Sequence, residues 1–362
     1  MVTGRGYQKD VAMLRRNFLA ATGSLLGAGL AGNFFPALAQ NQFGDAERLA
    51  ATLIKPSTQA AIDKALAWLA GRQNDDGSFG GSGYSRNIAV VSLAGMAFLS
   101  AGNTPGRGEY GEQVNKCISY VLNAADESGF VSIPSTASHG PMYDHGFATL
   151  FLAEIYGMTP DSDVREKLHR AVRLIVTTQN QEGGWRYQPK PVEADISVTI
   201  CQVMALRAAR NAGLFVPNET IDRCIDYVKR SQNADGGFMY MLQGGPSKFP
   251  RSAAGVVALY SAGIYEGDEI RKGLDYLSQQ LPKAEDFSRD THAMYGHYYA
   301  TQAMWQAGGE HWNKWYPVIH DVLLKQQQAD GSWMDLICAE YGTAMACIIL
   351  QMPNNYLPIF QR

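Results

Sequence analysis

The feature that most constrains the fold of this chain is a short motif, Gln-x-x-x-Gly-x-aromatic, that recurs along its length. Four copies are complete, among them Gln73 to Phe79 and Gln179 to Trp185, and two degenerate copies lie between them. A repeat of about 50 residues indicates a stacked or closed repeat architecture. The aromatic positions of the six copies are Phe79, Phe130, Trp185, Phe238, Phe287 and Trp333.

Two kinds of helical stretch flank each copy. The stretch before the turn is amphipathic; in the first, Ile62, Leu66 and Leu69 are spaced at i, i+4 and i+7 on one face. The stretch after the turn is apolar nearly all round, so it must be buried. We therefore predict an all-α fold, an α/α toroid (α6/α6 barrel) of six helical hairpins. Its outer helices are expected at 58–73, 112–125, 164–179, 220–232, 269–280 and 317–327, and its inner helices at 89–101, 147–156, 198–212, 253–262, 298–307 and 342–350.

The N-terminus has the pattern of an export signal. Arg15 and Arg16 precede an apolar, Gly- and Ala-rich run from Ala20 to Phe35 and a small-residue cleavage site ending at Ala39. Paired arginines before such a run are typical of a twin-arginine signal. The run is shorter than the roughly 20 residues that span a bilayer, which disfavours a retained anchor. We predict a signal peptide over 1–39, a linker over 40–56, the toroid over 57–352 and a C-terminal tail over 353–362, in an exported protein that is periplasmic or extracellular.

Charge and cysteine content narrow the function further. The whole chain has a net charge of −3 and residues 1–39 carry +3, so the remainder carries −6, which disfavours nucleic-acid binding. No apolar stretch after Ala39 is long enough to cross a bilayer, and we expect a monomer without a transmembrane segment. Cys117 and Cys224 occupy a small-residue position of the repeat, so they are predicted to be packing residues rather than metal ligands.

The segment from Lys64 to Phe79 reads K-x-x-x-W-L-x-x-x-Q-x-x-x-G-x-F, which resembles the QW repeat of squalene and hopene cyclases. The protein prenyltransferase β subunits have a similar repeat, and a second good copy runs from Arg223 to Phe238. The resemblance covers residues 50–352, and the C-terminal segment that begins at Tyr341 is similar to that of exported bacterial members. It implies the toroid fold without specifying a reaction.

The motifs that carry chemistry in that family are missing here. The resemblance implies an Asp-x-Asp-Asp acid in a cyclase, but none occurs. The nearest trace is Glu193-Ala-Asp195, and it is better explained by Asp195 or Ser197 capping the third inner helix. A prenyltransferase would hold zinc through Asp-x-Cys and a later histidine. The comparable segment reads Phe249-Pro-Arg251, and His297 lies near the place of the zinc histidine without its partners. No metal and no cofactor are expected.

In a closed ring the inner helices begin on one face, so their first residues converge on the mouth of a central cavity. This rim is more polar than an inert core requires, which favours a ligand site, although Asp and Glu are also ordinary caps. Asp144 and His145 are the candidate catalytic pair, with His145 as general acid or base and Asp144 or Asp195 setting its charge state. The candidate ligand-binding residues are Arg86, Tyr143, Glu193, Arg251, Tyr295, His297, Tyr298, Glu340 and Tyr341.

Two classes of function remain open at this point. In the first, the protein binds a ligand or a protein partner without catalysing the reactions of the family. The ligand would be apolar or would stack on aromatic side chains, and it would be isoprenoid-like or a carbohydrate. In the second it is a divergent enzyme, either an isoprenoid cyclase or transferase, or a polysaccharide lyase, since lyases also use α/α toroids. A closed aromatic pocket favours isoprenoids, whereas an inward-facing arginine, Arg86 or Arg251, beside a tyrosine or histidine in an open groove favours a lyase.

Overall fold

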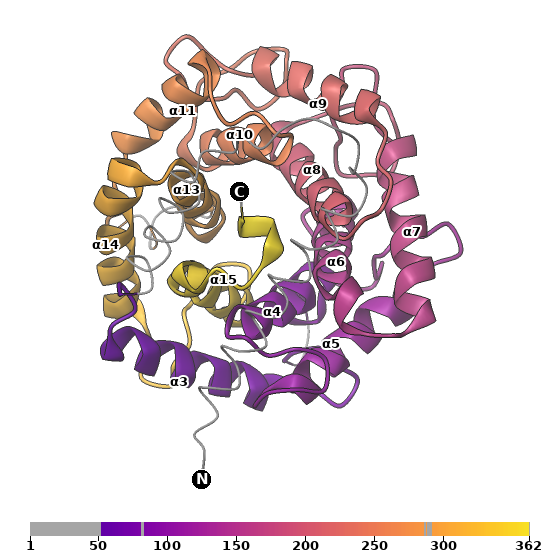
Figure 1. Cartoon of the computed structure of the whole chain (residues 1–362), viewed down its shortest axis with the longest axis vertical. Helices are drawn as coiled ribbons and strands as arrows, with labels where there is room; N and C mark the ends of the chain where they lie inside the picture. Colours follow the sequence, from indigo (N-terminus) through magenta and orange to yellow (C-terminus); the bar gives the residue numbers. More distant parts are fainter. Residues whose placement is uncertain (1–51, 81–82, 286, 288–291, 362) are drawn as a thin grey trace, which may run out of the picture.

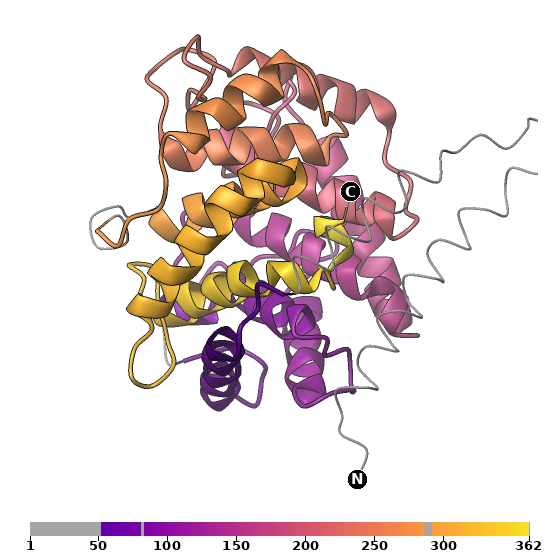
Figure 2. The ribbon, with the colours of Figure 1, turned by 60° about the vertical axis from the view of Figure 1, so that its left-hand side comes forward.

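The computed structural model describes residues 52–80, 83–285, 287 and 292–361, which form two concentric rings of helices (Figures 1 and 2). The helices follow one another around the ring in chain order, alternating between the outer and the inner layer. The α/α toroid predicted from the repeat is confirmed. The predicted signal peptide at 1–39, and most of the predicted linker, lie outside the described residues.

The outer ring presents one apolar face to the inner ring and a polar face to water. It consists of α3 (Pro56–Arg72), α5 (Gly111–Asn123), α7 (Ser162–Thr177), α9 (Asn218–Arg230), α11 (Asp268–Ser278) and α14 (Gly309–Gln326). The inner ring consists of α4 (Ile88–Ser100), α6 (Pro141–Ile155), α8 (Ile196–Asn211), α10 (Phe249–Ser261), α13 (Ala293–Ala307) and α15 (Ala339–Gln351). Each inner helix contacts the next and α15 contacts α4, so the inner ring is closed.

The inner ring forms the core of the molecule. Every residue of α4 is buried, as expected for a helix that is apolar all round. Cys117 and Cys224 are also fully buried, where their small side chains pack between helices as predicted. Within the described residues, none of the helices combines the length and the apolar character needed to cross a bilayer.

The repeat glutamines join neighbouring hairpins through their side-chain amides. Gln232 Nε2 donates to the carbonyl of Gly236 in its own turn, at 3.0 Å, and to that of Glu269 at the start of α11, at 2.9 Å. Each such amide thereby binds one hairpin to the next, which makes the motif structural. Gln73, Gln179 and Gln327 repeat the pattern, with second acceptors at Gln113, Thr220 and Ala61.

The repeat glycines allow the turn to press against the following outer helix. Gly236 has a φ of +87°, and a Cβ at this position would overlap the carbonyl of Lys272 in α11. Both the positive φ and the close approach require glycine. Gly77, Gly183 and Gly331 show the same positive φ and the same approach to the carbonyls of Lys116, Arg223 and Lys64.

Contacts of α3 with α14 and with the turn that follows α14 close the ring between the last and the first hairpin. Trp68 Nε1 donates to the carboxylate of Asp330 at 3.0 Å, and Thr58 Oγ1 lies 2.6 Å from His320 Nε2 in a buried hydrogen bond. These contacts join residues more than 260 positions apart in the chain. The toroid is therefore a single closed body rather than an open stack.

The C-terminal segment lies inside the inner ring (Figure 1). After α15 come two short 3₁₀ helices, η3 (Met352–Asn354) and η4 (Pro358–Phe360). Trp305 and Gln306, at the end of α13, both donate to the carbonyl of Phe360, and the Leu357 side chain is buried. The segment predicted as a tail is thus part of the toroid core, because its apolar side chains fill the end of the ring where the inner helices finish.

Several helices begin earlier than the sequence pattern predicted. The inner helix α13 begins at Ala293 instead of Tyr298, and the outer helix α14 begins at Gly309 and carries Pro317 in its interior. The first turns of several inner helices carry polar residues that interrupt the apolar periodicity, such as Asp144 in α6, Arg251 in α10 and Glu340 in α15. Tyr143, Arg251 and Tyr295 are consequently held on helices, whereas Arg86 and Glu193 precede the inner helices α4 and α8.

Replacing Gly236 with alanine is expected to destabilise the fold by roughly 2–4 kcal/mol, because the cost of a positive φ adds to the overlap with the Lys272 carbonyl. Gly213 is the matched control, since its φ is also +87° and nothing lies within 4 Å of an added Cβ. Gly213→Ala should therefore cost only about 1–2 kcal/mol. Urea unfolding of both variants measures the difference. Equal losses would contradict the role assigned to the close approach.

Candidate functional site

A cavity of about 440 Å³ lies where the inner helices begin. Its volume is in the range of small-molecule sites. Its lining comes from the first turns of the inner helices and from the loops that lead into them. The aromatic lining residues are Tyr84, Tyr143, Phe147, Tyr187, Tyr240, Tyr295 and Tyr341, and the others are Asn87, Ala89, Val90, Ser138, His139, Asp144, Ser197, Lys248, Pro250, Arg251, His292 and Ile337.

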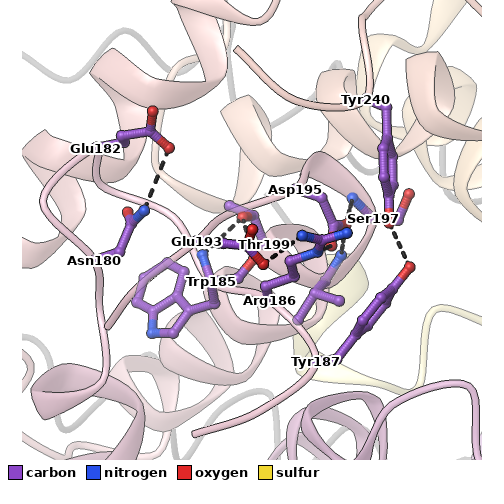
Figure 3. A network of polar contacts seen from close by, with 11 residues as sticks. Asn180, Glu182, Trp185, Arg186, Tyr187, Glu193, Asp195, Ser197, Thr199 and Tyr240 are labelled. Atoms are coloured by element: carbon purple, nitrogen blue, oxygen red, sulfur yellow. Dashed lines mark hydrogen bonds and ion pairs between the residues drawn. The ribbon is translucent and has the colours of Figure 1, made fainter. Parts of the chain in front are cut away.

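Hydrogen bonds orient the tyrosines of this cavity. The hydroxyl of Tyr295 in α13 donates to the carbonyl of Ser197 in α8 at 2.9 Å. The hydroxyls of Tyr187 and Tyr240 are hydrogen-bonded to each other across neighbouring loops (Figure 3). The ring of Tyr143 lies 6.2 Å from that of Tyr187. Because the hydroxyls of Tyr187, Tyr240 and Tyr295 are engaged within the protein, these three side chains offer the cavity mainly their aromatic surfaces.

Asp144 is the only carboxyl among the described residues that line the cavity. It lies in the first turn of α6 and is 2% exposed. Its Oδ1 accepts hydrogen bonds from Asn87 Nδ2 at 2.8 Å and Ser138 Oγ at 3.2 Å, and Ser132 Oγ lies 3.4 Å from Oδ2. Burial raises the pKa of Asp144 to about 7, against the opposing effect of these neutral donors. At neutral pH the carboxyl is therefore present in both protonation states.

The positively charged side chains of the cavity lining come from the start of α10. Lys248 immediately precedes the helix and Arg251 lies in its first turn, and both line the cavity. Arg251 Nε donates to the carbonyl of Phe238 at 3.0 Å, and its guanidinium lies 6.0 Å from the centre of the Tyr240 ring. Burial lowers the pKa of Arg251. These contacts hold the guanidinium beside the cavity without neutralising its charge.

Asp195 is not among the residues that line the cavity. It belongs to a polar network that also includes Arg186 and Ser197 (Figure 3). It caps α8, with Oδ1 accepting from the backbone N–H groups of Ser197 and Val198 at 2.9 Å. Burial raises the pKa of Asp195 to about 6. Arg186 Nε is 3.8 Å from its Oδ2, and the same guanidinium is paired with Glu193. The structure thus places Asp195 in the helix-cap position that the sequence offered as the simpler interpretation.

His145 faces away from the cavity, although it follows Asp144 directly. Its Nδ1 accepts from the backbone N–H of Val131 and its Nε2 lies near the carbonyl of Ala171, each at 3.2 Å. Burial lowers the pKa of His145 to about 4. The ring is therefore neutral and both nitrogens are engaged by backbone groups. The structure does not bring Asp144 and His145 together, because adjacent residues of a helix point about 100° apart.

His297 and Tyr298 of α13 are also buried outside the cavity lining. The imidazole of His297 packs between the rings of Phe249, 4.9 Å away, and Phe287, 4.8 Å away. Burial lowers the pKa of His297 to about 3. This apolar surrounding suits a packed neutral ring and offers no second metal ligand. Within the described residues no cluster of three histidine, cysteine or acidic side chains could hold a metal ion.

Three further predicted ligand-binding residues are engaged in ion pairs beside the cavity. Glu340, which is 3% exposed, accepts two hydrogen bonds from Arg72 of α3, at 3.0 and 3.1 Å. Arg86 is paired with Asp76 of the first repeat turn. Glu193 is paired with Arg186. None of these three residues lines the cavity. The predicted ligand-binding residues that do line it are Tyr143, Arg251, Tyr295 and Tyr341.

The cavity residues that the sequence reasoning missed include Tyr187 and Tyr240. Each lies two positions after the aromatic residue of its repeat, Trp185 or Phe238. The repeat aromatic is buried, and the next residue but one emerges at the cavity. Two positions after Phe130 and Trp333 the chain has Ser132 and Asp335, and neither of these lines the cavity, so the repeat alone gave no signal for the two tyrosines.

Comparison with known proteins identifies relatives in sequence and in structure. A family model described as the squalene-hopene cyclase C-terminal domain matches residues 123–296. The drimenyl diphosphate synthase of Streptomyces showdoensis is 25% identical over 182 residues, which are 50% of this chain and 32% of that protein. The chain thus matches about a third of the length of that relative.

Solved structures share the toroid at low sequence identity. A type II terpene cyclase from Scytonema, in complex with geranylgeranyl dihydroxybenzoate, aligns with a TM-score of 0.58 and 15% identity, over 83% of this chain and 98% of its own. A cellobiose 2-epimerase from Bacillus thermoamylovorans aligns with a TM-score of 0.58 and 12% identity, over 87% of this chain and 100% of its own. These likenesses establish the fold, which serves both isoprenoid and carbohydrate chemistry.

The raised pKa of Asp144 predicts a stability change with pH. The folded protein holds this proton to a pH of about 7, whereas an unfolded chain releases it near pH ~4, so stability is expected to fall as the pH rises between them. In Asp144→Asn that loss disappears. The unfolding free energy of Asp144→Asn, compared with that of the parent at the same pH, should therefore rise between about pH 4 and pH 7, by up to about 4 kcal/mol.

The control for this experiment is Asp330→Asn. Hydrogen bonds from the backbone and hydroxyl of Ser332 lower the pKa of Asp330, so its contribution to stability is lost as the pH falls, the opposite direction. Denaturant unfolding at pH 4, 6 and 8 measures both variants. A difference between parent and Asp144→Asn that is the same at all three pH values would contradict a raised pKa.

Proposed function

Because the chain is a toroid of the squalene-hopene cyclase and prenyltransferase-like family, we propose that it binds an isoprenoid-like ligand in the cavity at the start of its inner helices. The observation that carries this proposal is the aromatic lining. Six tyrosines and Phe147 surround about 440 Å³ of space. An aromatic surface of this kind stacks well on the alkene units of an isoprenoid chain.

The rest of the lining favours an isoprenoid over a sugar. On the α4 and α6 side the lining includes Ala89, Val90 and Phe147, which offer no hydrogen-bonding side chain, beside the polar Asn87 and Asp144. Any sugar hydroxyl that lies against the three apolar side chains would be left unsatisfied, at a cost of about 1–3 kcal/mol. The terpene cyclase relative with this fold is a complex with geranylgeranyl dihydroxybenzoate, which is an isoprenoid-bearing compound.

A second candidate function is catalysis, and Asp144 is the observation that favours it. A buried carboxyl whose pKa is about 7 keeps a proton at neutral pH and can donate it to an alkene carbon. Donors from Asn87, Ser138 and Ser132 would then stabilise the carboxylate that remains. The proton returns when the resulting carbocation loses one. His145 has no part in this scheme, since both its nitrogens bind backbone groups.

A polysaccharide lyase has less support. Of the two arginines proposed for a lyase, Arg86 is paired with Asp76 outside the cavity lining, and Arg251 remains. Arg251 lies beside Tyr240, but the hydroxyl of Tyr240 is bonded to Tyr187. That hydroxyl is not free to act as the base that abstracts a uronate proton.

We further propose that the protein acts outside the cytoplasm, as a monomer. The paired Arg15 and Arg16 before an apolar run support export by the twin-arginine route. The net charge of −6 after residue 39 argues for a small-molecule ligand rather than a nucleic acid.

Ligand binding is expected to raise the melting temperature of the purified protein. Farnesol and geranylgeraniol should raise it, whereas cellobiose and oligouronates should not. Tyr143→Ala should weaken isoprenoid binding by about three- to tenfold, the effect of about 0.5–1.5 kcal/mol of aromatic contact. Tyr156→Ala is the matched control, because Tyr156 lies in η2 (Tyr156–Met158), outside the cavity lining. Stabilisation by sugars instead of isoprenoids would refute the proposal.

If the protein is an enzyme, replacing Asp144 should lower product formation without weakening ligand binding. Incubation with geranylgeraniol, followed by mass spectrometry, should reveal cyclised products of unchanged mass. Asp144→Asn should lower their formation by at least about a hundredfold, the usual effect of removing a general acid, and leave ligand affinity within about twofold. Product formation that Asp144→Asn leaves intact would remove Asp144 from the mechanism and leave binding as the function.

A further inference from the structure

A second cavity lies in the outer ring, between the turn that follows α5 and the second half of α7, two helices that are neighbours in Figure 1. Its volume is about 550 Å³. It shares no lining residue with the cavity at the start of the inner helices, so it is a separate site. We call it the outer groove, and its lining residues are Asp126, Glu127, Ser128, Phe130, Arg170, Arg173, Leu174, Thr177, Thr178 and Pro189.

The outer groove lies at a junction where the repeat is incomplete. Ala125 pairs with Val131 across this turn. The same pairing in the first copy joins Gln73 to Phe79. An alanine therefore stands where the complete copies have their glutamine, and Val131, rather than Phe130, stands where they have their aromatic residue. An alanine supplies no amide to span the junction, and the space beside the half-buried Phe130 stays open.

The groove carries opposite charges that do not pair with each other across it. The turn supplies the carboxylates of Asp126 and Glu127, and α7 supplies the guanidinium groups of Arg170 and Arg173. Arg170 is bonded to Glu166 and to the backbone carbonyl of Glu127. Within the described part of the chain, neither the Glu127 carboxylate nor the Arg173 guanidinium has a partner. These two charges are therefore available to a ligand.

Asp126 keeps its negative charge at neutral pH. Its Oδ1 accepts hydrogen bonds from the backbone N–H and the hydroxyl of Ser128, at 2.8 and 2.6 Å, and from the N–H of Phe130 at 3.0 Å. Against the opposing effect of burial, these bonds lower the pKa of Asp126. Its Oδ2 takes no part in them. The turn side of the groove thus has two carboxylates, and the α7 side has two guanidinium groups.

The remaining lining offers apolar surface and hydrogen-bond acceptors. Phe130, Leu174 and Pro189 are all half-buried. Thr177 and Thr178 donate their hydroxyl hydrogens to carbonyls of their own helix, at 3.0 and 2.8 Å. Their oxygens can still accept a hydrogen bond from a ligand. A matching ligand therefore has two opposite charges, an apolar body and N–H donors.

We propose that the outer groove binds a short apolar peptide as a zwitterion, with its ammonium group on the Glu127 side and its carboxylate on Arg173. Apolar side chains of the peptide pack on Phe130 and Leu174, and its amide N–H groups donate to the threonine oxygens. The site lies outside the isoprenoid cavity and takes a different class of ligand. It extends the function of the protein without depending on the proposed one.

Ligands with one charge fit this groove less well. A simple anion gains Arg173 but also meets the carboxylates of Asp126 and Glu127, and a simple cation meets the arginines. A zwitterion satisfies both sides. A peptide suits the groove better than a free amino acid, because the unpaired charges lie too far apart to pair, and each added residue separates the ends of the ligand by roughly 3.5 Å more.

The experiment measures the affinity of the purified protein for leucylphenylalanine by titration calorimetry at pH 7, carried to millimolar ligand. The C-terminal amide and the N-acetyl form of the same dipeptide each lack one charge. We expect each of them to bind about five- to tenfold more weakly, because one charged contact is lost. Glycylglycine keeps both charges without apolar side chains and should bind at least about tenfold more weakly.

Two variants assign the charges of the ligand to the two sides. Arg173→Gln should reduce the preference for the dipeptide over its amide by at least about threefold, and Glu127→Gln should do the same for the preference over the N-acetyl form. Both side chains are exposed and lose no contact in these variants, so both proteins should fold. Arg165→Gln is the control, because Arg165 is an exposed arginine of α7 outside the groove.

The crossed pattern, in which each variant removes one preference and Arg165→Gln removes neither, supports the inference. A dipeptide that does not bind, or that binds no more tightly than its amide and N-acetyl forms, overturns it. Preferences that survive in both Arg173→Gln and Glu127→Gln overturn it as well, because the peptide is then bound elsewhere. Isoprenoid binding in the inner cavity is measured separately, and none of these results decides it.

Discussion

The structure depends on one hydrogen-bonding arrangement, the side-chain amide of the repeat glutamine. Gln232 bonds at once to its own turn and to the start of the next outer helix, and the other complete copies do the same. Each bond places a hairpin relative to its successor. The bond from Gln327 to Ala61 joins the last hairpin to the first, so the angle set at each junction adds up to a closed ring.

Closure of the ring determines where function can reside. All inner helices begin at the same end, so residues of their first turns gather around one cavity. At the other end the segment containing Leu357 and Phe360 packs among the inner helices. The chain therefore builds a pocket instead of a channel, and the apolar, aromatic and cationic parts of its lining come from different hairpins.

Reasoning from the sequence identified the rim but not the direction of each side chain. Tyr143, Asp144, Arg251, Tyr295 and Tyr341 reach the cavity. His145 directly follows the cavity residue Asp144, yet one step along a helix turns a side chain by about 100° and sends it into the core. Tyr298, three positions after the cavity residue Tyr295, is buried in the core as well. Asp195 was equally visible in the sequence, but its carboxyl is occupied by the N–H groups of its own helix.

The sequence by itself determined the all-α toroid and its two layers, since a motif recurring about every 50 residues and the alternation of amphipathic with apolar helices leave few other solutions. Only the tertiary structure decided the site. The pKa of Asp144 depends on the burial that surrounding helices impose, and the unpaired charge of Arg251 depends on which carboxylates its neighbours already hold. Periodicity is a local property of the chain, whereas burial and charge pairing are set by residues that the closed ring brings together.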